Sequence, residues 1–116
     1  MDVFDDKQRI IQEFVPGKQV TLAHVIASPD LTLYSKLGLI EEAGAIGIFT
    51  ITPSEGAMIA ADISTKAANV KIGFVDRFNG SLLIVGDVSA VEEALQAVMD
   101  LLCDKMGFAS VPLTKS

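Results

Sequence analysis

Few side chains in this 116-residue sequence have the chemistry of a catalytic group, and they do not form a recognised set. His24 is the only histidine and lies in an apolar segment, where a histidine is more often a packed or edge residue than a catalyst. Cys103 is the only cysteine and has no partnering base in the sequence pattern, so we interpret it as a small packing residue. We therefore predict no metal site and no cofactor.

The carboxylates do not supply the missing chemistry. Glu41-Glu42 and Glu92-Glu93 are adjacent pairs, and adjacent side chains do not face each other on a helix. The sequence contains no nucleotide-binding glycine motif and no Gly-x-Ser-x-Gly element for a nucleophile. A catalytic function is therefore not predicted.

The overall composition excludes several other functions. Half of the residues are hydrophobic and 21% are charged, which is typical of a folded domain. The formal net charge is -6, and no basic cluster is present that would bind nucleic acid or an anionic membrane surface. No apolar run reaches the roughly 18 residues of a membrane span, and the first residues do not resemble a signal peptide. We expect a cytoplasmic protein without nucleic-acid or membrane partners.

Apolar periodicity and turn residues predict strands that alternate with helices. Strands are expected over 19–27, 45–52, 70–77 and 82–86, helices over 29–37, 53–68 and 90–106, and a further short strand near 111–113. Asn79-Gly80 predicts a tight hairpin between the last two of the main strands. The segment 45–77 should form a right-handed parallel crossover.

Polar residues near the expected helix starts have the spacing of capping motifs. Ser28 is expected to cap the first helix. Asp87 and Ser89 are both candidate caps of the last helix. Thr52 with Glu55, and Ser89 with Glu92, match the spacing of a capping box. The buried face of the second helix is expected to include Ile59, Ile63 and Ala67, and that of the last helix Val91, Leu95, Val98 and Leu102.

The pattern predicts an α+β domain, one sheet with helices packed against it, over residues 18–116. Residues 1–17 form a separate N-terminal arm in this interpretation, with an extended, strand-like segment at 9–15 and a turn at Pro16-Gly17. The sequence pattern does not assign this arm to the hydrophobic core of the domain. Together with the apolar composition and the small helix residues, it favours a self-associating subunit.

Several motifs along the chain resemble one protein family. They are IIQEFVPGKQVTLAH (10–24), AGAIG (43–47), AMIA (57–60), IGFVDRF (72–78), VEEAL (91–95) and the terminal TKS (114–116). This pattern is similar to the EutS/PduU type of circularly permuted shell proteins of bacterial microcompartments. The resemblance extends over nearly the whole sequence.

The resemblance implies a fold and an assembly. The fold would be a permuted, ferredoxin-like α+β variant, and six copies would form a tile in a cytoplasmic microcompartment shell. The shell would enclose metabolic enzymes and limit diffusion of an aldehyde intermediate, for example in ethanolamine, propanediol or choline utilisation. Partners would be other copies, other shell proteins and enclosed enzymes. The arm would form an inter-subunit β-barrel over the central pore, through Ile10, Ile11, Gln12, Glu13, Phe14 and Val15.

The resemblance also assigns residues to a pore and to a tile edge. The pore loop would consist of Arg77, Phe78, Asn79, Gly80 and Ser81, with Phe78 in place of the family's usual small residue. Lys66 matches a lysine at the tile edge, close to Asn69. Ser28 stands where the family's partner arginine is expected, so edge packing should differ from that of ordinary shell proteins.

A second interpretation remains open. A ferredoxin-like layout is shared by small-molecule-binding regulatory domains, and the fold alone does not choose between the two functions. A regulatory domain would be a dimer or trimer with a bound metabolite, whereas a shell subunit would be a hexamer.

Overall fold

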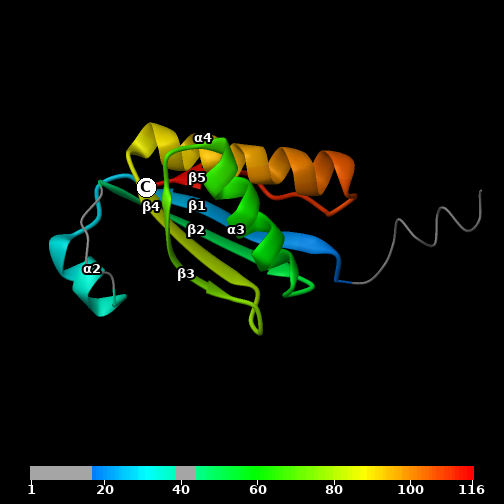
Figure 1. Cartoon of the computed structure of the whole chain (residues 1–116), viewed down its shortest axis with the longest axis horizontal. Helices are drawn as coiled ribbons and strands as arrows, with labels where there is room; N and C mark the ends of the chain where they lie inside the picture. Colours follow the sequence, from blue (N-terminus) through cyan, green and yellow to red (C-terminus); the bar gives the residue numbers. More distant parts are fainter. Residues whose placement is uncertain (1–16, 39–43) are drawn as a thin grey trace, which may run out of the picture.

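The computed structural model describes residues 17–38 and 44–116, which form one five-stranded sheet covered by helices (Figure 1). The sheet has the strand order β3-β4-β2-β1-β5. The elements in chain order are β1 (Gln19–Ile26), α2 (Leu31–Lys36), β2 (Ala45–Thr52), α3 (Gly56–Ala67), β3 (Lys71–Asp76), β4 (Ser81–Gly86), α4 (Val88–Met99), a π-helical continuation η1 (Asp100–Lys105), and β5 (Thr114–Lys115). All four main strands predicted from the sequence are confirmed within one or two residues.

The strand directions confirm a parallel crossover. β2 and β3 are both antiparallel to β4, which lies between them, so β2 and β3 run in the same direction and are joined through α3. The Asn79-Gly80 turn connects β3 to β4 as the hairpin that the sequence predicted. β1 pairs with β2 antiparallel and with β5 parallel.

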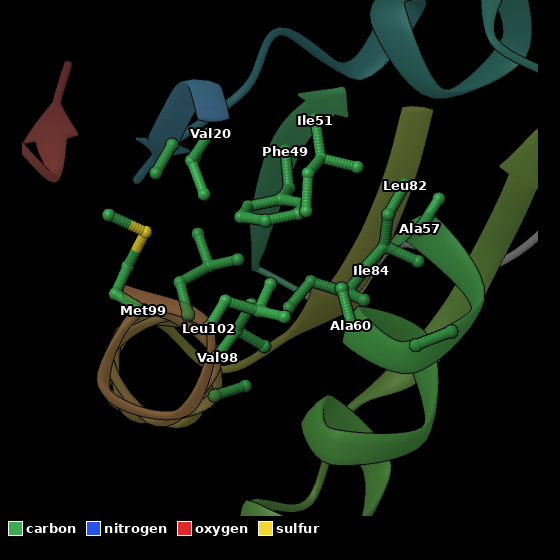
Figure 2. Close-up of a cluster of buried hydrophobic side chains, with 14 of the residues drawn as sticks. Val20, Phe49, Ile51, Ala57, Ala60, Leu82, Ile84, Val98, Met99 and Leu102 are labelled. Carbon is green, nitrogen blue, oxygen red and sulfur yellow. The ribbon is translucent and has the colours of Figure 1, made fainter. Parts of the chain in front are cut away.

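The main core lies between one face of the sheet and the pair α3 and α4 (Figure 2). Phe49 of β2 and Ile84 of β4 point toward the helices and are fully buried, as are Leu95 of α4 and Leu102 of η1. Full burial of side chains of this size contributes roughly 1.5–3 kcal/mol each. All four residues that the sequence assigned to the buried face of the last helix are indeed buried.

A smaller cluster lies on the opposite face of the sheet, under α2. Tyr34 packs there with Ile46, Leu83 and Val85, and Leu33 and Leu37 lie at its border. The sheet is therefore covered on both faces at this end, which explains why β2 and β4 read as nearly continuous apolar runs.

The predicted caps of α2 and α3 are wrong. Asp30, not Ser28, caps α2, and its carboxylate accepts a hydrogen bond of 3.0 Å from the backbone nitrogen of Thr32. α3 begins at Gly56 without a side-chain cap, because the backbone carbonyls of 53–55 accept bonds from the first nitrogens of the helix. Asp87, one of the two candidates for α4, is its N-cap residue, although its side chain forms no capping hydrogen bond. Ser89 therefore lies inside the helix and is not the cap.

The predicted buried face of α3 is also wrong. Ile59 is exposed, and Ile63 and Ala67 are only half-buried. The buried residues of α3 are small, namely Gly56, Ala57, Ala60, Ala61 and Ser64. A Cβ atom on Gly56 would lie 2.6 Å from Cδ1 of Ile51, so α3 approaches the sheet too closely for large side chains between them.

The bounds of the last helix and of the last strand differ slightly from those predicted. α4 and η1 together span the helix predicted over 90–106, and Gly107, with a φ of 78°, follows them. The short final strand is Thr114–Lys115, just after the segment that the sequence favoured.

Candidate functional site

The turn between β3 and β4 contains the predicted pore-loop residues, and Asp76 organises it. One carboxylate oxygen of Asp76 accepts bonds from the backbone nitrogens of Phe78 (2.9 Å) and Asn79 (3.1 Å). The other oxygen accepts a bond of 2.9 Å from Nδ2 of Asn79. These bonds, chiefly those from Asn79, lower the pKa of Asp76 below the ordinary value of a carboxyl group. The sequence analysis did not single out Asp76, although an aspartate just before a turn is a known signal.

Gly80 attaches this turn to the end of β2. Its carbonyl oxygen accepts a bond of 2.9 Å from the backbone nitrogen of Ile51, and its own nitrogen donates to the carbonyl of Asp76 at 2.8 Å. Gly80 has a φ of 75°, in the left-handed region that glycine adopts without steric cost. The Asn-Gly signal in the sequence therefore located the turn correctly.

Arg77 and Phe78 are the side chains that this turn presents to its surroundings. The guanidinium carbon of Arg77 lies 4.9 Å from the centroid of the Phe78 ring, which is a cation–π distance. Phe78 is 78% exposed, more than any other large hydrophobic residue in the described part of the chain. Arg77 and Phe78 also form part of the wall of a shallow groove of about 590 Å³. The other lining residues are Met58, Phe74, Val75 and Asp76.

The three residues assigned to the tile edge are all exposed. Lys66 lies in the last turn of α3, and its Nζ forms an ion pair of 2.9 Å with Oδ2 of Asp62 one turn earlier. Asn69 follows α3, and Ser28 follows β1. An exposed pair of this kind contributes little to stability, so the lysine is available for other contacts.

His24 lies in the inner strand β1, where it pairs with Ile48 of β2 on one side and with Thr114 of β5 on the other. Its Nδ1 lies 2.6 Å from Oγ1 of Thr114, and its Nε2 lies 2.8 Å from Oγ of Ser116. The Thr114 hydroxyl also lies within 3.3 Å of the carbonyl oxygen of Ala23 and can donate to it. His24 therefore fastens the segment 114–116 to β1.

Cys103 has the environment of a packing residue. It is half-buried in η1, and burial raises the pKa of its thiol above the ordinary value, which disfavours the nucleophilic thiolate. Within residues 17–38 and 44–116, no group of three histidine, cysteine or acidic side chains is placed to hold a metal ion. No helix in the same ranges is long and apolar enough to cross a membrane.

The predicted barrel residues, Ile10 to Val15, lie outside the described residues. The pair Glu41-Glu42 does so as well, and Glu92 of the other acidic pair forms an ion pair of 2.9 Å with Lys115.

Comparison with known proteins identifies close relatives. Residues 45–111 match the family model described as "BMC domain". The bacterial microcompartment shell protein EutS of Escherichia coli (strain K12) is 58% identical over 111 residues, which cover 96% of this chain and 99% of EutS. The shell protein PduU of Salmonella typhimurium is 56% identical over 93% of each chain. A solved structure described as "CutR flat hexamer, form 1" has a TM-score of 0.84 and 52% identity, and covers 88% of this chain and 94% of its own. The resemblance derived from the sequence motifs is confirmed.

Proposed function

The chain belongs to the BMC-domain family of bacterial microcompartment shell proteins, and we propose that six copies of it form a ring-shaped tile of such a shell. The observation that carries this proposal is the 52% identity and TM-score of 0.84 with the CutR flat hexamer over 88% of the chain. The role is structural, with no catalytic step.

The β3–β4 turn fits the wall of a central pore. It is the most exposed apolar turn in the described part of the molecule, and it is held in one shape by Asp76 and by the bond to Ile51. In a six-fold ring, six copies of Arg77 and Phe78 would surround the axis. Bulky Phe78 side chains would narrow the opening there, and the Arg77 guanidinium groups would add positive charge.

The N-terminal arm, residues 1–17, would cap this pore. β1 starts at Gln19, and the carbonyl of Lys18 just before it accepts a bond from the backbone nitrogen of Ala109. Six strands that contain Ile10, Ile11, Phe14 and Val15 could close into a small barrel, which leaves no strand edge unpaired. An apolar plug would slow polar metabolites, because their dehydration costs free energy.

Lys66, Asn69 and Ser28 would lie where one tile meets the next, with other shell proteins as neighbours. Lys66 is 75% exposed and forms a surface ion pair with Asp62, so it can pack across a tile boundary. Because Ser28 replaces a long cation, contacts between tiles should be weaker than those within a tile. The shell would lie in the cytoplasm, enclose metabolic enzymes and retain an aldehyde intermediate of a pathway such as ethanolamine, propanediol or choline utilisation.

Native mass spectrometry of the full chain tests the proposed ring. We expect a mass of six subunits. A dimer or trimer that carries a bound metabolite would instead support the small-molecule-binding regulatory domain. The family match favours the shell protein between these two outcomes.

The plug has its own test. Deletion of residues 1–15 should leave a six-subunit ring while increasing the permeability of reconstituted shells to a polar dye. Unchanged permeability in intact rings would show that the arm does not close the pore.

A further inference from the structure

The residues that precede β1 are fastened to the segment that follows the last helix. The backbone nitrogen of Val20 donates a hydrogen bond of 2.9 Å to the carbonyl of Ala109, and the nitrogen of Ala109 donates one of 3.1 Å to the carbonyl of Lys18. The point where the N-terminal arm joins the domain is therefore held from two distant parts of the sequence.

The side chain of Lys18 adds a contact at the same point. Its Nζ lies 5.2 Å from the centroid of the Phe108 ring, which is a cation–π distance. Phe108 is only 8% exposed and belongs to the main core, and Lys18 is itself half-buried. A cation on a buried ring is held more firmly than one in an exposed ion pair, so this contact can fix the lysine.

The end of the last helix gives the same ammonium group a second attraction. A Cβ atom on Gly107, which follows η1, would lie 3.7 Å from Nζ of Lys18. The nitrogen of Phe108 donates to the carbonyl of Leu102 at 3.0 Å and closes the helix there. Because the C-terminal end of a helix carries a partial negative charge, it favours a cation at this position.

Gly17 turns the backbone immediately before Lys18. Its φ is 81°, and a Cβ atom on it would lie 3.2 Å from Cγ2 of Thr52, so the backbone passes close to the end of β2. Only Pro16 and Gly17 separate Lys18 from the predicted barrel segment 10–15 in the sequence. A change in how Lys18 is held is therefore transmitted to that segment across two residues.

The start of β1 and the candidate pore loop lie at the same end of the sheet (Figure 1). Gln19 pairs with Thr52 of β2, and Ser81, which follows the loop, pairs with Thr50 of the same strand. Three strand spacings separate β1 from β3, roughly 14 Å, which about five extended residues can span. The direction in which the arm leaves Lys18 therefore decides whether it reaches the pore loop.

We propose that Lys18 is a positioning residue, which uses Phe108 and the end of η1 to direct the N-terminal arm toward the pore. The proposal rests on the pore cap of the proposed function. Six arms must meet on one axis to close a barrel, and an arm that is already held at its base loses less conformational entropy when it pairs. Lys18 would thus favour closure without lining the barrel.

Hydrogen exchange of residues 10–15 in intact rings of the full chain tests this role. Lys18→Met keeps the aliphatic part of the side chain and removes the charge. We expect exchange at 10–15 to accelerate by roughly 3- to 30-fold, which corresponds to the loss of a cation–π contact. The six-subunit mass and the exchange rates in β2 and β4 should stay unchanged.

Two further variants separate the contact from a general effect of the substitution. Lys18→Arg should restore protection, because a guanidinium group also binds the face of an aromatic ring. Lys36→Met is the matched control, since it removes an exposed lysine from the last turn of α2, and it should leave exchange at 10–15 unchanged.

A double-mutant cycle tests whether the Phe108 ring is the partner of Lys18. Phe108→Leu removes the aromatic face but keeps an apolar residue in the core, and it should also accelerate exchange at 10–15. Because both variants break one contact, the double variant should accelerate exchange no more than Lys18→Met does. Effects that multiply in the double variant would overturn the proposed contact.

The outcomes distinguish failure of this proposal from failure of the pore cap. Wild-type rings whose residues 10–15 exchange as fast as an unstructured peptide would overturn the cap itself. Protected wild-type rings with equal protection in Lys18→Met would overturn the role of Lys18 only. Acceleration that extends equally to β2 and β4 would show that Lys18 stabilises the domain as a whole and does not position the arm.

Discussion

The backbone nitrogen of Ile51 donates a hydrogen bond of 2.9 Å to the carbonyl oxygen of Gly80, which joins the end of β2 to the β3–β4 turn. The two residues are so close that a Cβ atom on Gly80 would overlap the carbonyl oxygen of Ile51. The same Cβ atom would lie 3.1 Å from Cα of Ser54. The position of the candidate pore loop is therefore set by a backbone contact that only glycine permits.

Gly80→Ala should displace this turn and lower the free energy of unfolding by about 1–3 kcal/mol, the cost of a strained left-handed backbone, together with the steric overlap. Urea unfolding at a fixed subunit concentration measures the change. Gly38→Ala is the matched control, because Gly38 has a similar φ of 78° but no atom near the added Cβ. An equal loss in both variants would show that contact with Ile51 is unimportant.

Asp76 should make the turn sensitive to acid. Because the folded protein lowers the pKa of this carboxyl, its contribution to stability is present above the unfolded value of about 3.9 and is lost as pH falls through the folded value. Asp76→Asn should therefore be less stable than the wild type at pH 7 and equally stable near pH 2.

Thermal unfolding across this pH range measures that difference. Asn79→Ala removes the donor of one side-chain bond to Asp76 and should reduce the pH dependence only in part. A constant difference between wild type and Asp76→Asn at all pH values would contradict the role of the carboxylate charge.

Much of the fold could be predicted because its signals are local. The runs that form β2 and β4 are dense in β-branched and aliphatic residues, and Asn79-Gly80 specifies the hairpin by backbone conformation alone. The last helix was located correctly because Val91, Leu95 and Leu102 recur with helical spacing on one buried face.

The features that the sequence did not predict depend on tertiary contacts. Ile59 was expected in the core because a large aliphatic residue is usually buried, but the close approach of α3 at Gly56 reserves that side for small residues. Likewise, the backbone carbonyls of 53–55 replace the cap expected from Thr52. The sequence analysis also missed the role of Asp76 in the candidate pore loop. Asp76 accepts hydrogen bonds within a turn whose position depends on the bond between Ile51 of β2 and Gly80, and this is a tertiary contact.

His24 should determine how firmly the chain end is held. Both of its ring nitrogens bond to hydroxyl groups of that segment, and the amide of Ser116 donates to the carbonyl of Val25 at 2.9 Å. His24→Ala should therefore accelerate hydrogen exchange at residues 114–116 several-fold, while exchange in β2 and β4 stays unchanged.

The control for this variant is Lys115→Ala. It removes an exposed ion pair with Glu92, and such pairs contribute about 0–1 kcal/mol. Exchange at the chain end should change much less than in His24→Ala. Equal protection in His24→Ala and wild type would show that the backbone bonds alone hold β5.

The close packing of α3 predicts different effects on its two sides. Ala60 is fully buried against the sheet, so Ala60→Leu should force the helix outward and lower the free energy of unfolding by about 1–3 kcal/mol, as overpacked cores do. Thr65→Leu adds a similar side chain on the exposed side of the same helix and should be neutral or slightly stabilising, since leucine favours helix more than threonine does. Urea unfolding of both variants at the same subunit concentration makes the comparison. Equal stability of Ala60→Leu and Thr65→Leu would mean that the space between α3 and β2 is larger than the contact of Gly56 with Ile51 allows. The explanation given above for the exposed position of Ile59 would then also be wrong.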